Sequence, residues 1–288
     1  MRRWFAVAAL SFLLACSAWA QSPPSQAAGY NLVWSDNFSS LSLCTGNTGD
    51  TTTCNWWNPG VWWKTAGGTI TDPSNTYVNL DWQTGQSGDA SATEISTDEP
   101  NGSHFRAWTF GYFEASMKFQ NVAGSSPAVW LISNQWGPQG GDTNGQYYPE
   151  IDILEWQSNN PVFEGTLHCW HLGSDAGNNN STDTYAFPSG TDLTAYNTYG
   201  VLWTPTSVSW YVNNVLMETF STTSAPFSTT FGGSKSLSFI LSDQAGCNNT
   251  YPCTPTQISP LDMQVQWVHV FQATPAVEPP KQLTAVVK

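Results

Sequence analysis

The sequence predicts an all-β protein. Glycine and proline are frequent, at 23 and 18 of 288 residues, and only 10% of the residues are charged. No segment keeps an apolar period of 3.6 residues, so long amphipathic helices are not expected. Short segments rich in Val, Ile and aromatic residues alternate in polarity and end at turn residues, as β-strands do. The clearest of them are residues 30–34, 111–119, 208–212, 237–241 and 264–271.

Residues 1–20 are typical of a secretory signal. Arg2 and Arg3 precede an apolar run at 4–14, which is too short to span a bilayer, and Ala-Trp-Ala at 18–20 fits a small-x-small cleavage site. The alternative is a lipoprotein processed at Cys16, but the residues before Cys16 fit that pattern poorly. We therefore expect a secreted protein, extracellular or periplasmic, that begins near Gln21.

The rest of the chain predicts one folded domain at 30–272, flanked by extensions at 21–29 and 273–288, because neither an internal repeat nor a linker interrupts it. The formal net charge is −13, and it becomes −15 once Arg2 and Arg3 are removed. Such a negative charge argues against nucleic acid or an anionic membrane as partner. No later segment is long and apolar enough for a membrane span. We expect a monomer.

Five cysteines remain after removal of the signal. Two pairs flank short loops and could close them as disulfides in an oxidising compartment. These pairs are Cys44 with Cys54 and Cys247 with Cys253. The fifth, Cys169, lies in a strand-like segment and is expected to be a small buried side chain. No Cys or His spacing matches a zinc site, so the sequence predicts no catalytic metal.

Residues 148–157, YPEIDILEWQ, concentrate three acids in a chain poor in charge. On a β-strand, Glu150 and Asp152 share one face while Ile151 and Ile153 point to the other. Regular alternation would bury Glu155 in the core without a partner, at a high free-energy cost. We therefore predict a one-residue β-bulge between Asp152 and Glu155 that returns Glu155 to the acid face.

Two carboxylates on one face of a strand fit a glycosidase, in which one attacks the anomeric carbon and the other protonates the leaving oxygen. The alternative is a half-exposed strand with a solvated acidic face. The spacing of the acids does not by itself separate these two interpretations.

The string EIDILE resembles the catalytic signature of glycoside hydrolase family 16, the laminarinase and lichenase group. Five further segments resemble blocks of that family in the same order: FRAWTFGYFEASMKF (105–119), SPAVWLI (126–132), GTLHCW (165–170), YGVLWTPTSVSWYVNN (199–214) and MQVQWVHVFQ (263–272). The resemblance implies a β-jelly-roll sandwich of two antiparallel sheets with a concave substrate groove. It also implies a retaining endo-β-glycosidase that hydrolyses β-1,3- or mixed-linkage β-glucan.

The resemblance assigns the three acids their roles. Glu150 is the nucleophile, Glu155 is the general acid and base, and Asp152 orients Glu150. Glu155 must hold a proton near neutral pH, which an apolar neighbour such as Trp156 and two nearby negative charges favour.

Four more residues are expected in the substrate-binding cleft. Trp130 stands where the family places a Trp beside the sugar at the cleavage point, and Trp156 follows Glu155 directly. His168, in GTLH, is expected to contact Glu155 or substrate. Arg106 either helps to hold the cleft or belongs to a surface ion pair. Indole faces stack on the apolar faces of sugar rings, which gives the 16 tryptophans of the chain a reason beyond core packing.

Departures from the family pattern keep other substrates open. Many β-1,3-glucanases have a second Trp where this chain has Ser126, so a galactan such as agar, porphyran or carrageenan is an alternative polysaccharide partner. A transglycosylase would share every catalytic residue, and a carbohydrate-binding sandwich without catalysis would share the fold. Retention of all three acids argues against the last alternative. No cofactor is predicted. A structural calcium ion is compatible with the family, but the sequence does not assign its ligands.

Overall fold

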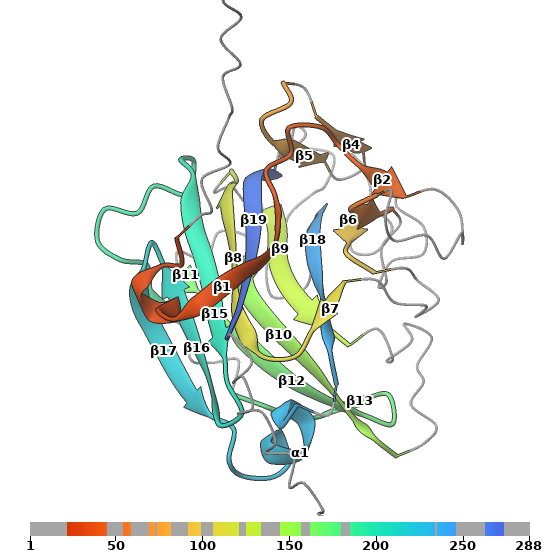
Figure 1. Cartoon of the computed structure of the whole chain (residues 1–288), viewed down its shortest axis with the longest axis vertical. Coiled ribbons are helices and arrows are strands. Elements are labelled where there is room, and N and C mark those ends of the chain that lie inside the picture. Colours follow the sequence, from red (N-terminus) through yellow and green to blue (C-terminus); the bar gives the residue numbers. More distant parts are fainter. Residues whose placement is uncertain are drawn as a thin grey trace, which may run out of the picture.

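The computed structural model describes residues 22–44, 54–58, 69–72, 74–81, 92–98, 106–120, 125–133, 145–156, 162–179, 185–233, 235–245 and 263–273. Two large β-sheets face each other in this part of the chain (Figure 1). The sequence prediction of an all-β sandwich is confirmed, and each of the five predicted strand segments contains a strand. The predicted signal at 1–20 and the pair Cys247 and Cys253 lie outside the described residues.

The first sheet is antiparallel throughout. Its order is β17 (Val215–Ser221), β16 (Ser207–Val212), β15 (Asn197–Trp203), β8 (Gly111–Lys118), β19 (Met263–Ala273), β5 (Val78–Asp81) and β4 (Thr69–Thr71), and β1 (Tyr30–Asp36) also pairs with β19.

The second sheet carries the acidic segment. Its order is β13 (Ser174–Asn178), β12 (Thr166–His171), β10 (Tyr147–Glu155), β9 (Ser125–Ile132), β18 (Leu237–Ala245), β6 (Thr93–Ser96), β3 (Trp56–Trp57) and β2 (Leu43–Cys44), and β7 (Ala107–Trp108) pairs with β18. Neighbouring strands are antiparallel except β2 and β3, which are parallel. The strand β10 therefore lies well inside the sheet, between β9 and β12.

Smaller elements complete the described part. A two-stranded sheet joins β11 (Val162–Phe163) to β14 (Tyr185–Ala186), and the helix α1 (Phe227–Phe231) lies at the lower end of the molecule in Figure 1. The short 3-10 helix η1 (Ser25–Ala27) belongs to the predicted N-terminal extension, yet Gln26 donates a hydrogen bond to the Tyr112 hydroxyl at 2.6 Å. Part of this extension is thus attached to the first sheet.

The main hydrophobic core lies between the two sheets. Period-two alternation sends Ile151 and Ile153 of β10 inward, where they join side chains of the opposite sheet such as Phe113 and Val201. All four are fully buried. The inward face of β10 is therefore fixed by apolar packing, and this leaves the opposite face for the acids.

The disulfide between Cys44 and Cys54 forms as predicted. It joins β2 to the residues just before β3, and Trp57 packs beside it. Cys169 is a buried free thiol, as expected. Among the described residues, no helix is long and apolar enough to cross a membrane.

Candidate active site

The predicted bulge is present in β10. Asp152 lies opposite Trp130 of β9, but the next paired residue is Leu154, opposite Val129, so Ile153 is the additional residue. The shift places Glu155 opposite Ala128. Because Ala128 and Trp130 are two residues apart on β9, Glu155 shares the face of Asp152.

Contacts from outside β9 and β10 satisfy the backbone at the bulge. The indole Nε1 of Trp210, from the opposite sheet, donates to the Asp152 carbonyl oxygen at 2.7 Å. The Glu155 amide donates to the Glu164 carbonyl at 3.0 Å. A bulge leaves backbone groups without ladder partners, and here two of them find partners in other segments.

The face that carries the acids is not a solvated surface. Glu150 is 8% exposed and Asp152 is 4% exposed. An apolar cluster lies on the same face, formed by Trp130, Ile132, Tyr148 and Ile240 with Ala128 and Trp170 against it. Burial of carboxylates among aromatic side chains costs free energy, so a plain acidic surface is the poorer interpretation.

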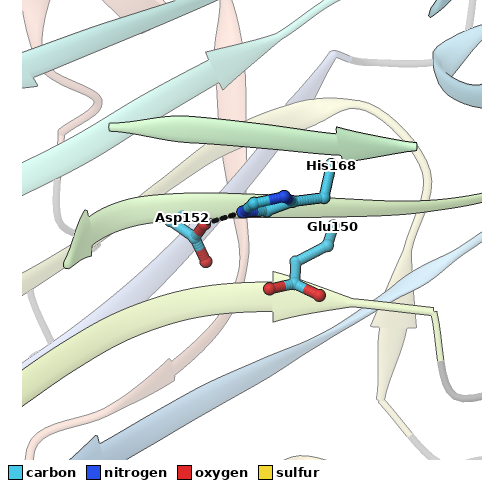
Figure 2. A group of neighbouring side chains, drawn as sticks. All are labelled: Glu150, Asp152 and His168. Atoms are coloured by element: carbon cyan, nitrogen blue, oxygen red, sulfur yellow. Dashed lines mark ion pairs between the residues drawn. The ribbon is translucent and has the colours of Figure 1, made fainter. Parts of the chain in front are cut away.

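His168 joins the acids from β12, where it lies opposite Glu150. Its Nε2 lies 3.2 Å from Asp152 Oδ2, and its Nδ1 lies 2.9 Å from Asp175 Oδ2. Figure 2 shows the imidazole and the Asp152 carboxylate pointing toward one another, with the Glu150 carboxylate beside them. The ion pairs of His168 are thus with Asp152 and Asp175, and its predicted contact with Glu155 or substrate stays a prediction.

Burial and charge shift the pKa values in this cluster. Burial, followed by the negative charge of Asp152, raises the pKa of Glu150 well above its ordinary range, although His168 and a hydrogen bond from Trp170 oppose the increase. Burial alone would lower the pKa of His168. The hydrogen bonds to Asp152 and Asp175 and the charges of Asp152 and Glu150 outweigh it and raise that pKa to about 11. His168 is therefore a cation at neutral pH.

One atom each of Glu150, Asp152 and His168 lies within 4.8 Å of the others, close enough to hold a metal ion. A protonated imidazole has no free lone pair, however, and the Nδ1 of this one is already hydrogen-bonded to Asp175 Oδ2. We assign these residues no metal-binding role, and the predicted lack of a catalytic metal stays a prediction.

Residues 74–258 match the family model described as glycosyl hydrolases family 16. The chain belongs to glycosyl hydrolase family 16. It is 28% identical over 219 residues to the endo-1,3-1,4-beta-glycanase EglC of Rhizobium meliloti, covering 67% of this chain and 43% of that protein. It is 27% identical over 173 residues to the keratan-sulfate endo-1,4-beta-galactosidase of Sphingobacterium multivorum, covering 57% of this chain and 37% of that protein. The chain thus spans less than half the length of these relatives.

Two of the solved structures that share the fold illustrate the likeness. The laminarinase catalytic domain of Thermotoga maritima superimposes with a TM-score of 0.59 at 19% identity, covering 85% of this chain and 99% of that one. An endo-β-galactosidase of Clostridium perfringens gives a TM-score of 0.62 at 18% identity, covering 88% and 66% of the two chains. These likenesses support the sandwich architecture of this family 16 protein.

Trp130 lies where a family 16 substrate-binding residue was expected. It is opposite Asp152 on the acid face, 6% exposed, and its Nε1 donates to Ser242 Oγ at 3.0 Å. The structure therefore places Trp130 on the acid face, as expected for a cleft residue. Its contact with a sugar stays a prediction.

The prediction that Trp156 lines the cleft is wrong. Trp156 is 0% exposed and packs in the core between the sheets, with ring centroids 5.4 Å from Phe119 and 6.0 Å from Phe187. Neighbouring residues of an extended chain point to opposite faces, so a residue that follows Glu155 of the acid face enters the core. Such a buried indole offers no face to a sugar ring.

Arg106 lies just before β7 and reaches the disulfide loop. Its Nη1 donates to the carbonyl oxygens of Cys54 at 2.7 Å and Asn55 at 3.3 Å, and its guanidinium lies 5.9 Å from the ring centroid of Trp34. These contacts give Arg106 a structural role beside β3. A role in holding the cleft stays a prediction.

Sequence reasoning missed Trp170. Its Nε1 donates to Glu150 Oε2 at 2.6 Å, and its ring stacks on His168 with centroids 5.5 Å apart. Trp170 follows His168 by two residues on β12, so period two places both on one face. That spacing was readable in the sequence, but the pairing of β12 with β10 was not.

Replacement of Trp170 by Phe should have its largest effect at acidic pH. The hydrogen bond from Trp170 favours the ionised form of Glu150, so its loss raises the pKa of Glu150 further. We expect kcat/KM below neutral pH to fall about 10- to 100-fold, since a hydrogen bond to a charged group contributes ~1.5–3 kcal/mol. The acid limb of the pH profile should move to higher pH. An unmoved limb would show that this hydrogen bond does not control the ionisation of Glu150.

Proposed function

We propose that this chain is a retaining endo-β-glycosidase that hydrolyses β-1,3- or mixed-linkage β-glucan by double displacement. One observation carries the proposal. The bulge in β10 brings Glu150, Asp152 and Glu155 to one face, where Trp170 holds Glu150 and His168 holds Asp152. Two glutamates with supporting residues on one surface suit the chemistry of a retaining enzyme.

In the first step, a Glu150 oxygen attacks the anomeric carbon while Glu155 gives its proton to the leaving glycosidic oxygen. The products are a glycosyl ester of Glu150 and a shortened polysaccharide. In the second step, Glu155 takes a proton from water, the water oxygen attacks the anomeric carbon, and the ester bond to Glu150 breaks. Trp170 and His168 act on the state in which Glu150 is an anion, because a donated hydrogen bond and a nearby cation both stabilise it.

Glucan is the preferred substrate because relatives include the Rhizobium meliloti endo-1,3-1,4-beta-glycanase EglC. Galactan is a second candidate, supported by the relative named keratan-sulfate endo-1,4-beta-galactosidase and by Ser126. Ser126 lies on β9 opposite Gln244, two residues before Ala128 and thus on the acid face. Loss of a stacking Trp at this position removes a contact that a glucan would use.

Export of the chain is part of the proposal. The charged and apolar pattern of residues 1–20 supports a secretory signal, and the Cys44–Cys54 disulfide suits an oxidising compartment. Lipid attachment at Cys16 is the alternative, and the mass of the mature N-terminus would distinguish the two.

The test is release of reducing ends by the purified protein from laminarin, mixed-linkage glucan, agarose, porphyran, carrageenan and keratan sulfate, with Glu150→Gln in parallel. We expect cleavage of a glucan by the parent only, with β-anomeric products seen first by proton NMR. Cleavage of a galactan would retain the mechanism and replace the substrate. Longer products would indicate transglycosylation. Binding to a polymer without cleavage of any would overturn the enzymatic proposal in favour of a binding sandwich.

A further inference from the structure

The strand β13 brings one more carboxylate to the acid cluster. Asp175 lies opposite Trp170 of β12, one strand further from β10 than His168. Its Oδ2 lies 2.9 Å from His168 Nδ1 and accepts from Asn178 Nδ2 at 3.1 Å. Its Oδ1 accepts from the amides of Cys169 and Gly177, both at 3.2 Å. Four hydrogen bonds therefore fix the orientation of this carboxylate.

The fixed carboxylate determines how His168 faces the acids. A cationic imidazole carries a proton on both nitrogens, and here Nδ1 donates to Asp175 Oδ2 while Nε2 lies 3.2 Å from Asp152 Oδ2 as an ion pair. The ring also stacks on Trp170, at an interplanar angle of 21°. With one nitrogen held on β13 and one face held by Trp170, the remaining N–H points to Asp152.

We propose that Asp175 is a positioning residue for the glycosidase reaction, which keeps His168 charged and aimed at Asp152 so that Glu150 can act as the nucleophile. The side-chain contacts of Asp175 are with His168 and with residues of β12 and β13. It acts indirectly: Asp175 holds His168, His168 pairs with Asp152, and Asp152 lies beside Glu150. This inference rests on the proposed function, since it assigns Glu150 the nucleophilic role.

The charged groups around His168 come from two neighbouring strands. Glu150 and Asp152 face it from β10, and Asp175 faces it from β13. Glu155 acts on Glu150 as a further negative charge. The single cation among these groups favours ionisation of Glu150, while burial and Asp152 oppose it. Removal of the Asp175 charge lowers the pKa of His168. Where that pKa falls toward the pKa of Glu150, fewer molecules carry the cation and Glu150 is more often protonated.

Asp175→Asn tests the charge with little change of shape. The amide oxygen can still accept from His168 Nδ1, but the negative charge is gone and the amide NH2 group then faces the backbone donors of Cys169 and Gly177. We expect the pKa of His168 to fall, kcat/KM at neutral pH to fall about 10- to 100-fold, and the acid limb to move to higher pH. KM should change less than kcat, because Asp175 contacts His168 on the side away from Asp152 and Glu150. Asp175→Ala, which also removes the acceptor, should lose at least as much.

Asp192→Asn is the matched control. Its carboxylate is exposed, accepts hydrogen bonds from Thr194, and its loss changes the net charge equally. This variant should keep the parent pH profile. If the acid limb of the pH profile moves equally in both variants, the effect of Asp175→Asn comes from the change in net charge alone.

Two measurements decide the proposal. The first is the pH profile of kcat/KM with thermal unfolding of each variant. The second is NMR titration of the four imidazoles in protein labelled with ¹⁵N-histidine, which needs no activity. The proposal is supported if one imidazole stays protonated to high pH in the parent and shows a lower pKa in Asp175→Asn.

An unmoved acid limb in Asp175→Asn, or a rate loss equal at all pH values with a lowered Tm, would overturn it and leave a purely structural carboxylate. A parent inactive on every polysaccharide refutes the proposed function instead. The NMR titration still decides in that case whether Asp175 holds the charge on His168.

Discussion

Glu150→Gln should lower kcat by roughly 10⁴-fold or more, because the amide cannot form the glycosyl ester. The change preserves shape. The amide oxygen of the new side chain can still accept the Trp170 hydrogen bond that now reaches Glu150 Oε2 at 2.6 Å. Substrate should therefore still bind. Equilibrium dialysis with an oligosaccharide of the polymer that the parent cleaves fastest would measure this binding. Substantial turnover by the purified variant would remove Glu150 from the nucleophilic role.

The same variant should be more stable than the parent above the ordinary pKa of a glutamate. Burial and Asp152 raise the pKa of Glu150 in the folded state, so folding favours the protonated form. The contribution of Glu150 to stability is fully present below the unfolded pKa of ~4.3 and declines as pH rises through the folded pKa. The neutral amide of the variant does not titrate, so its contribution shows no such decline. We expect the Tm of the variant to match the parent near pH 4 and to exceed it by about 2–4 °C at alkaline pH.

Glu155→Gln should lower kcat roughly 10²- to 10⁴-fold on a polysaccharide, the usual contribution of general acid and base catalysis. The loss should be smaller in the first step for a substrate with a good leaving group, because such a group needs no proton. Pre-steady-state measurements would give the rate of the first step on aryl glycosides and on polysaccharides. An equal loss of that rate on both substrates would contradict the acid role of Glu155.

Trp210→Ala should destabilise the protein by ~3–5 kcal/mol, the usual cost of truncating a large buried aromatic side chain. Trp210 is fully buried and donates to the Asp152 carbonyl at 2.7 Å. Its ring fits against Gly165, where an added Cβ would lie 2.6 Å from Trp210 Cδ1. Urea unfolding would measure the loss. A change below ~1 kcal/mol would show that this indole does not support the bulge.

Trp210→Phe separates packing from the hydrogen bond. A smaller aromatic ring replaces the indole, and the Asp152 carbonyl loses its donor. We expect a loss of ~1–3 kcal/mol in stability together with reduced kcat, since the bulge positions Glu155. Trp203→Phe is the matched control. Trp203 is also fully buried and donates to a backbone carbonyl at 3.1 Å, that of Phe231, the last residue of α1. It should lose similar stability while kcat stays near the parent value.

The short-range features of this protein follow from its sequence. Period-two alternation assigned Ile151 and Ile153 to the core, and the cost of burying an unpaired acid required the bulge before Glu155. A short loop between Cys44 and Cys54 predicted their disulfide. The same alternation, continued one residue beyond Glu155, would also have placed Trp156 in the core.

The partners of the acids depend on tertiary structure. Trp170 reaches Glu150 and His168 reaches Asp152 only because β12 pairs with β10 in one particular register, and Asp175 follows from the pairing of β13 with β12. Local sequence sets which face of a strand a side chain takes, whereas strand order and register depend on how the whole core packs. The charge of Glu150 and His168 depends on burial and on neighbours from other strands, so only the folded sheet determines it.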